Sequence, residues 1–182
     1  MMYNFDKKVI MATVDEKTFS KAISSDGDLI FMLSSDILTI GDKINLAHKM
    51  GKKVFVHLDM ADGIGKDRYG VEFLRSRKVD GVITTKNNIV VACKKVGMAV
   101  VQRFFIIDSK SIETAIESVK STRPDMVELM PGVVYKAIER FSKEVNIPVI
   151  AGGLIATSDE VKKAINYGAS AVSTTKIPLW TI

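Results

Sequence analysis

Short apolar runs rich in β-branched residues recur along the whole chain at nearly regular intervals. Eight such runs begin at Val9, Leu29, Lys53, Asp80, Ala99, Asp125, Pro148 and Ala169. Their starts lie 19 to 27 residues apart, which is room for one strand, one helix and two short loops. The pattern therefore predicts eight strands that alternate with helices.

The stretches between these runs carry signals for the ends of helices. Thr13 with Glu16, and Thr157 with Glu160, have the spacing of a capping box, in which each side chain bonds a backbone N–H that the helix leaves unpaired. Asp108 can cap the helix that follows it in a similar way. Glycines that end three of the stretches are Gly51, Gly97 and Gly168. These signals support seven helices between the predicted strands.

Strands that alternate with helices pair in parallel, and eight such units close naturally into a barrel. The sequence thus predicts an α/β protein, a compact (β/α)₈ TIM barrel that forms a single domain over residues 1–182. Only the segment KIPLWTI follows the eighth predicted strand, so we expect the last helix to be truncated.

A truncated last helix has a consequence for the surface of the barrel. We expect apolar barrel surface around Ile177, Leu179 and Trp180 to need a cover. Because exposed apolar patches commonly become interfaces, the expected cover is a second copy of the chain in a symmetric homodimer.

Composition and charge indicate where the protein is located and what kind of ligand it can bind. The chain is 47% hydrophobic and no apolar run approaches the ~18 residues that a membrane helix needs, so we expect no membrane partner. The lone Cys93 excludes an internal disulfide and favours a cytoplasmic location. The net charge of +5 suits a polyanion or a phosphorylated ligand, although an excess of lysine on solvated helix faces explains it equally well.

Polar residues gather where the predicted strands end, and in such barrels the functional site lies at those ends. The strongest signal combines two glycines after the seventh strand with two hydroxyls at the eighth, namely Gly152, Gly153, Ser173 and Thr174. Glycine lets backbone N–H groups approach an anion closely, and barrel proteins often hold phosphate between these two loops. The alternative is that the paired glycines only permit a tight turn.

Other strand-end residues have more than one interpretation. His57 and Asp59 lie two apart on one predicted strand, where they can contact a ligand together or form a structural pair. Glu128 lies within an apolar run and needs a cationic partner, for which Arg103, Lys86 and Lys176 are candidates. A carboxylate and a lysine across a barrel can also perform enolisation or Schiff-base chemistry, so an enzyme remains an alternative.

Metal and nucleotide chemistry have little support in the sequence. One cysteine and two histidines without ligand spacing predict no metal site. Phosphate-loop motifs and the signatures of known RNA-binding modules are absent. Several basic pairs could meet RNA phosphates, among them Arg75 with Arg77 and Lys78, although each is typical of a solvated surface.

Six strings in order resemble the motifs of the bacterial glycerol uptake operon antiterminators: HLDMADG, GVITTK, VQRFFIIDS, VELMPG, IAGGLI and AVSTTKIPLW. The resemblance runs from about residue 33 to residue 180. It implies a non-catalytic barrel without a cofactor that binds glycerol 3-phosphate as its effector. It also implies binding to the leader mRNA of a glycerol operon, which promotes transcription antitermination of glycerol-utilisation genes.

The resemblance also implies roles for individual residues. The phosphate would lie on Gly152, Gly153, Ser173 and Thr174, and the hydroxyls near His57, Asp59, Gln102, Arg103 or Glu128. Because the phosphate is a dianion, we expect Arg103 together with Lys86 or Lys176 to face the pocket. The chain departs from the family at Thr175 and Lys176, where serine and asparagine are usual, and Lys176 adds a cation there.

Three hypotheses remain open at this point. The first is a regulator whose ligand changes its affinity for RNA, which requires two states of different affinity and no catalytic base. The second is a phosphosugar enzyme of the isomerase, epimerase or aldolase type, since a fold does not fix a function. The third is a relative that has kept phosphate binding and lost RNA binding.

Overall fold

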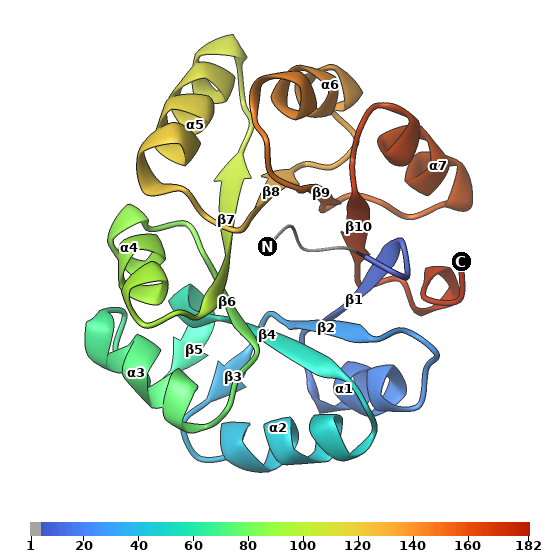
Figure 1. Cartoon of the computed structure of the whole chain (residues 1–182). Coiled ribbons are helices and arrows are strands. Elements are labelled where there is room, and N and C mark those ends of the chain that lie inside the picture. Colours follow the sequence, from blue (N-terminus) through green and yellow to red (C-terminus); the bar gives the residue numbers. More distant parts are fainter. Residues whose placement is uncertain (1–4) are drawn as a thin grey trace.

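The structure, a computed structural model, describes residues 5–182 and confirms the closed barrel (Figure 1). Eight parallel strands close in the order β1-β10-β9-β8-β7-β6-β4-β2. Their bounds are β1 Val9–Thr13, β2 Leu29–Met32, β4 Lys53–His57, β6 Gly81–Thr84, β7 Ala99–Phe105, β8 Met126–Met130, β9 Val149–Gly152 and β10 Ala171–Thr174. Each corresponds to one of the eight apolar runs.

Seven α-helices surround the barrel within the described residues (Figure 1). Their bounds are α1 Glu16–Ile23, α2 Ile40–Lys49, α3 Arg68–Ser76, α4 Asn87–Lys95, α5 Ser109–Thr122, α6 Tyr135–Glu144 and α7 Ser158–Asn166. Each helix connects one barrel strand to the next, as the alternating pattern predicts.

The interior of the barrel is filled by apolar side chains except at the carboxyl ends of the strands. Phe31 and Phe55 stack with their ring centroids 5.9 Å apart, and Ile10, Ile83 and Val101 pack in the same inner cluster. A second and larger core lies between the strands and the helices. The inner cluster leaves space for polar side chains only at the strand ends, which is where the barrel can hold a ligand.

A small two-stranded parallel sheet, which the sequence did not predict, joins the loops that follow β2 and β4. Its strands are β3 Ser35–Asp36 and β5 Ala61–Asp62. Between β4 and β5 the chain forms one turn of 3₁₀ helix, η1 Leu58–Met60. Two-residue strands are too short to produce a hydrophobic alternation, so no sequence pattern marks them.

The helix ends confirm most of the predicted signals and correct one. Thr157 and Glu160 form a capping box at α7, and Asp108 caps α5. The box predicted for Thr13 with Glu16 is wrong, because Thr13 is the last residue of β1 and Asp15 caps α1 together with Thr18. The three predicted helix-ending glycines all have positive φ, which favours glycine: Gly51, Gly97 and Gly168.

The segment after β10 forms only one turn of 3₁₀ helix, η2 Ile177–Leu179, in agreement with the truncated last helix. This segment nevertheless covers its own apolar side chains. Leu179 and Trp180 are buried, and the indole N–H of Trp180 donates to the carbonyl of Thr174 over 2.8 Å. The expected uncovered patch is therefore wrong at these two residues, and the homodimer stays a prediction without that support.

No helix within residues 5–182 combines the length and the apolar character that crossing a membrane requires.

Candidate functional site

A cavity of about 420 Å³ opens at the carboxyl ends of the strands, and its volume lies in the range of small-molecule sites. Its polar lining comes from β7, β8 and the end of β10, and consists of Arg103, Glu128, Ser173, Thr174, Thr175 and Lys176. Its apolar lining consists of Ala12, Leu33, Met130, Leu154, Ile155 and Ala156. With two cations against one carboxylate, the lining favours an anionic ligand.

A buried polar network forms the floor of this cavity. Arg103 and Glu128 lie side by side on β7 and β8, and Arg103 Nε donates to Glu128 Oε2 over 2.6 Å. The hydroxyl of Ser173 on β10 donates to the other oxygen, Glu128 Oε1, over 2.5 Å. Glu128 thus has the cationic partner that its burial requires. Within the described residues, the terminal amino groups of Arg103 have no protein acceptor and remain available at the cavity.

Gly152 has no side chain, and the space beside its Cα is occupied by atoms of this network. A Cβ atom on Gly152 would lie 2.3 Å from Glu128 Oε1 and 2.8 Å from Ser173 Oγ, closer than van der Waals contact permits. Glycine at the end of β9 is therefore what allows the carboxylate and the hydroxyl to meet. The sequence pointed to this glycine for phosphate binding, and the structure shows that it makes room for the polar floor.

The loop after β9 has the backbone shape expected for an anion site. Gly153 and Leu154 have φ values of +74° and +60°, so two consecutive residues are left-handed. Neither N–H group has a hydrogen-bond acceptor among the described residues. Successive unpaired N–H groups in a turn can form a concave anion site, and Lys176 lines the same cavity.

The hydroxyl of Thr174 is already engaged. Thr174 Oγ1 donates to the carbonyl of Ile155 over 2.8 Å and accepts from the N–H of Lys176 over 3.1 Å. These bonds fasten the loop after β9 to the end of β10. Thr174 lines the cavity but acts mainly by positioning the two loops that enclose it.

His57 and Asp59 do not share a strand, which corrects one assumption of the sequence analysis. β4 ends at His57, and Asp59 lies in the 3₁₀ turn that follows. The nearest atoms of the pair, His57 Nε2 and Asp59 Oδ2, are 3.7 Å apart, which is too far for a hydrogen bond. Neither residue lines the cavity. Nε2 of His57 is buried and has no hydrogen-bond partner within residues 5–182.

The carboxylate of Asp59 joins the ends of two neighbouring strands. It accepts from Thr84 Oγ1 over 2.7 Å, from the Thr85 N–H over 2.7 Å and from Thr85 Oγ1 over 2.8 Å. Burial alone would raise the pKa of Asp59, but the neighbouring His57 ring and these three donors lower the pKa by more. The pKa therefore lies well below the ordinary aspartate value.

We expect Asp59→Asn to lower the free energy of unfolding by about 1.5 to 3 kcal/mol at pH 7, because bonds to a charged group are lost. Since the folded pKa of Asp59 is depressed, this contribution is complete above the unfolded pKa near 3.8 and disappears as pH falls toward the folded pKa. Urea unfolding at pH 7, 5, 4 and 3 measures it. The exposed Asp26→Asn is the control. A difference between wild type and Asp59→Asn that does not shrink below pH 4 contradicts the assignment.

Two further predicted ligand residues lie outside the cavity. Gln102 faces the helices, where it donates to Asn87 and Ser118 and accepts from the Thr122 hydroxyl. Lys86 is the exposed N-cap of α4. Because β7 alternates its side chains, the inward direction of Arg103 sends Gln102 outward. The structure therefore brings Arg103 and Glu128 together with the residues of the last two strands. Gln102 and Lys86 lie away from this group.

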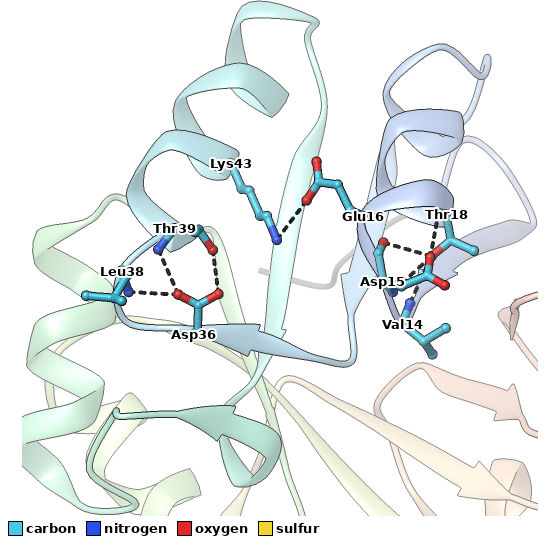
Figure 2. Close-up of polar contacts among 8 residues, drawn as sticks. All are labelled: Val14, Asp15, Glu16, Thr18, Asp36, Leu38, Thr39 and Lys43. Atoms are coloured by element: carbon cyan, nitrogen blue, oxygen red, sulfur yellow. Dashed lines mark hydrogen bonds and ion pairs between the residues drawn. The ribbon is translucent and has the colours of Figure 1, made fainter.

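A second, smaller cavity of about 120 Å³ lies beside α1 and α2, near the end of β2. Figure 2 shows that two of its three carboxylates serve helix ends: Asp15 accepts from Thr18, and Asp36 accepts from Leu38 and Thr39. Lys43 pairs with Glu16 over 3.0 Å across the two helices. With these groups engaged in capping and pairing, the larger cavity is the better candidate for a ligand.

The apolar half of the main cavity is the part that sequence reasoning missed. Met130, Leu33 and Leu154 have no chemical signature that distinguishes them from core residues. One signal was available for Met130, because it lies two residues after Glu128 on β8 and therefore points to the same side.

Among residues 5–182, no three His, Cys, Asp or Glu side chains are grouped closely enough to hold a metal ion.

The fold and the cavity together define the class of this protein, a (β/α)₈ barrel with a cationic cavity at its strand ends. The sequence profile of the glycerol-3-phosphate responsive antiterminators matches residues 9–180. The chain therefore belongs to that family.

Individual relatives agree with this assignment. The Escherichia coli protein YgcP is 32% identical over 175 residues, which cover 96% of this chain and 92% of YgcP. The crystal structure of the glycerol uptake operon antiterminator regulatory protein from Listeria monocytogenes is 32% identical, with a TM-score of 0.94 over 99% of this chain and 98% of that one. An antiterminator-related protein from Thermotoga maritima is 33% identical, with a TM-score of 0.88 over the whole of both chains.

More distant structures share the fold alone. A deoxyribose phosphate aldolase from Aeropyrum pernix has a TM-score of 0.72 at 15% identity, over 94% of this chain and 86% of that one. At this level of identity the likeness says nothing about activity.

Proposed function

We propose that this protein is a cytoplasmic sensor of glycerol 3-phosphate that binds the leader mRNA of glycerol-utilisation genes and prevents premature termination of transcription. The cavity at the strand ends would hold the effector. Its occupancy would change the affinity of the protein for RNA, because a ligand shifts a conformational equilibrium only when it binds the two states unequally.

The observation that carries this proposal is the distribution of donors around the cavity. The unpaired N–H groups of Gly153 and Leu154, together with Lys176, suit the phosphate. The free amino groups of Arg103 add the second positive charge that a dianion needs, and the oxygens of Glu128 and Ser173 are near enough to receive hydroxyl groups. Family membership supports the same ligand.

The chemistry of the cavity favours a regulator over an enzyme. Glu128 already accepts from Arg103 and Ser173, so its carboxylate is not a free general base. Lys176 is exposed, whereas a lysine that forms a Schiff base is usually activated by burial or by a second cation. We therefore propose that binding, without turnover, is the function of this cavity.

We expect glycerol 3-phosphate to raise the melting temperature by roughly 5 to 10 °C at 100 times its Kd, because saturation then stabilises the folded state by about 2.7 kcal/mol. A thermal shift assay with free glycerol and inorganic phosphate as controls measures this. Retention of the labelled leader transcript, with and without the effector, tests the RNA step.

The outcome that overturns the ligand assignment is a melting temperature unchanged by glycerol 3-phosphate. An equal shift with inorganic phosphate would instead show a general anion site. Leader RNA that is not retained under either condition would refute the regulatory part of the proposal.

A further inference from the structure

The net charge of the protein is concentrated in one sixth of its sequence. Residues 66–95 contain eight Lys and Arg against three Asp and Glu, a net charge of +5. The remainder of the chain has 18 basic and 18 acidic residues and is neutral. This segment spans α3, β6 and α4, and the two helices pack side by side on one flank of the barrel (Figure 1). The positive charge of the protein thus lies on one flank.

The cations of α3 have no carboxylate partners within the described residues. Arg75, Arg77 and Lys78 are exposed and form no ion pair there. On α6, by contrast, Arg140 and Lys143 are each paired with glutamates of the same helix. Glu72 is also exposed on α3 but forms no ion pair with these cations, so they stay available to a polyanion.

Two aromatic rings in this segment each have an arginine guanidinium over them. The guanidinium carbon of Arg68 is 4.5 Å from the ring centroid of Tyr69, and that of Arg77 is 5.1 Å from the ring of Phe73. Tyr69 and Phe73 lie one turn apart on α3, and Arg77 is its C-cap; Phe73 is partly buried against the core, so Tyr69 is the exposed ring of the two. Tyr69 is 67% exposed, and its hydroxyl accepts from the guanidinium of Arg68. The exposed Tyr69 ring beside a guanidinium can receive a planar ligand.

We propose that single-stranded RNA binds the exposed side of α3 together with the turn that follows it, the α3 surface formed by Arg68, Tyr69, Phe73, Arg75, Arg77 and Lys78. Proteins recognise unpaired bases by stacking them on aromatic rings and guanidinium planes, with cations along the backbone. Both elements are present here: the exposed Tyr69 ring on α3, and the exposed cations Arg75, Arg77 and Lys78 at its C-terminal end. This inference rests on the proposed function, because it assigns the surface for the RNA partner named there.

An acidic protein is the competing partner for a basic surface. Acidic peptides would use the charges of Arg75, Arg77 and Lys78 but would gain little from an exposed, flat Tyr69 ring. The combination of charge and stacked rings therefore favours RNA. Because α3 lies outside the cavity wall, substitutions on its surface leave the effector site intact and can be tested separately.

The experiment compares RNA retention by matched variants of the full chain, with the glycerol-gene leader transcript and a mixed-sequence single-stranded RNA of about 20 nucleotides as probes. Tyr69→Ala should weaken binding by about 5- to 160-fold, the range for loss of one stacked base. Arg75→Gln with Arg77→Gln should reduce the slope of log affinity against log salt by about 1.4, for two phosphate contacts on a single strand. Lys162→Gln with Lys163→Gln, on α7 at the opposite flank, removes the same charge and should change little (Figure 1).

The possible outcomes distinguish failure of the α3 surface from failure of the proposed function. Wild-type protein that retains RNA, together with α3 variants that bind like the α7 control, overturns the α3 surface and leaves the proposed function standing. Wild-type protein that retains neither probe, with or without glycerol 3-phosphate, overturns both. Displacement of RNA by polyglutamate as readily as by unlabelled RNA identifies an acidic protein as the partner and also overturns the proposal. An unchanged thermal shift with glycerol 3-phosphate shows that each variant is folded.

Discussion

Arg103→Ala is expected to weaken glycerol 3-phosphate binding by about 1.5 to 3 kcal/mol, the range for hydrogen bonds to charged groups. The same change should lower the free energy of unfolding by about 3 to 5 kcal/mol, because Glu128 is left buried without its cation. Calorimetry on the folded protein measures the first effect and chemical denaturation measures the second. The two readouts separate a ligand role from a purely structural one.

The matched control removes both charges. Arg103→Met with Glu128→Leu should recover most of the lost stability, since apolar replacement of a buried ion pair is often neutral or stabilising. It should not recover ligand binding, because the guanidinium is still missing. If the affinity of the folded Arg103→Ala protein for glycerol 3-phosphate equals that of the wild type, Arg103 only holds Glu128 and does not belong to the effector site.

Gly152→Ala should have the second-largest effect, a loss of about 3 kcal/mol of stability, at the upper end for overpacking. The new methyl group would meet Glu128 Oε1 and Ser173 Oγ, and the carboxylate has no free direction because both its oxygens are bonded. We expect the displaced network to carry Arg103 away from the cavity, so that ligand affinity falls together with stability. Denaturation and calorimetry on the same variant measure both.

Gly41→Ala supplies the comparison. A Cβ atom on Gly41 in α2 meets no atom closer than 3.7 Å, and alanine favours the helix, so this variant should be neutral or more stable. A Gly152→Ala protein as stable as Gly41→Ala would show that the network tolerates a methyl group, and that Gly152 has no special place in it.

The barrel could be predicted from the sequence because each strand is a buried apolar run and each helix carries its own end signals. Thr157 and Asp108 cap helices as their spacing indicates. Arg103, Glu128 and Ser173 were also foreseeable, since an ionised side chain inside an apolar run must find partners, and those partners lie at the same ends of neighbouring strands.

The sequence did not show in which direction individual side chains at the strand ends point. In β7, Val100 and Val101 are both buried, one toward the helices and one inside the barrel, so the apolar run does not show which of Gln102 and Arg103 points inward. Strand β4 ends at His57, before Asp59. The 3₁₀ turn that follows places the Asp59 carboxylate against the end of β6, where it accepts from Thr85. Such turns depend on tertiary contacts that a single sequence does not reveal.

The uneven charge of residues 66–95 also affects how the protein meets a partner before contact. If the α3 surface binds RNA as proposed, the excess of +5 in residues 66–95 would favour encounters in which the α3 and α4 side faces the approaching polyanion. Encounters are then productive more often than chance orientation allows, and the association rate constant falls steeply as ionic strength rises. The protein would therefore find a nascent transcript quickly, within the short interval before a terminator forms.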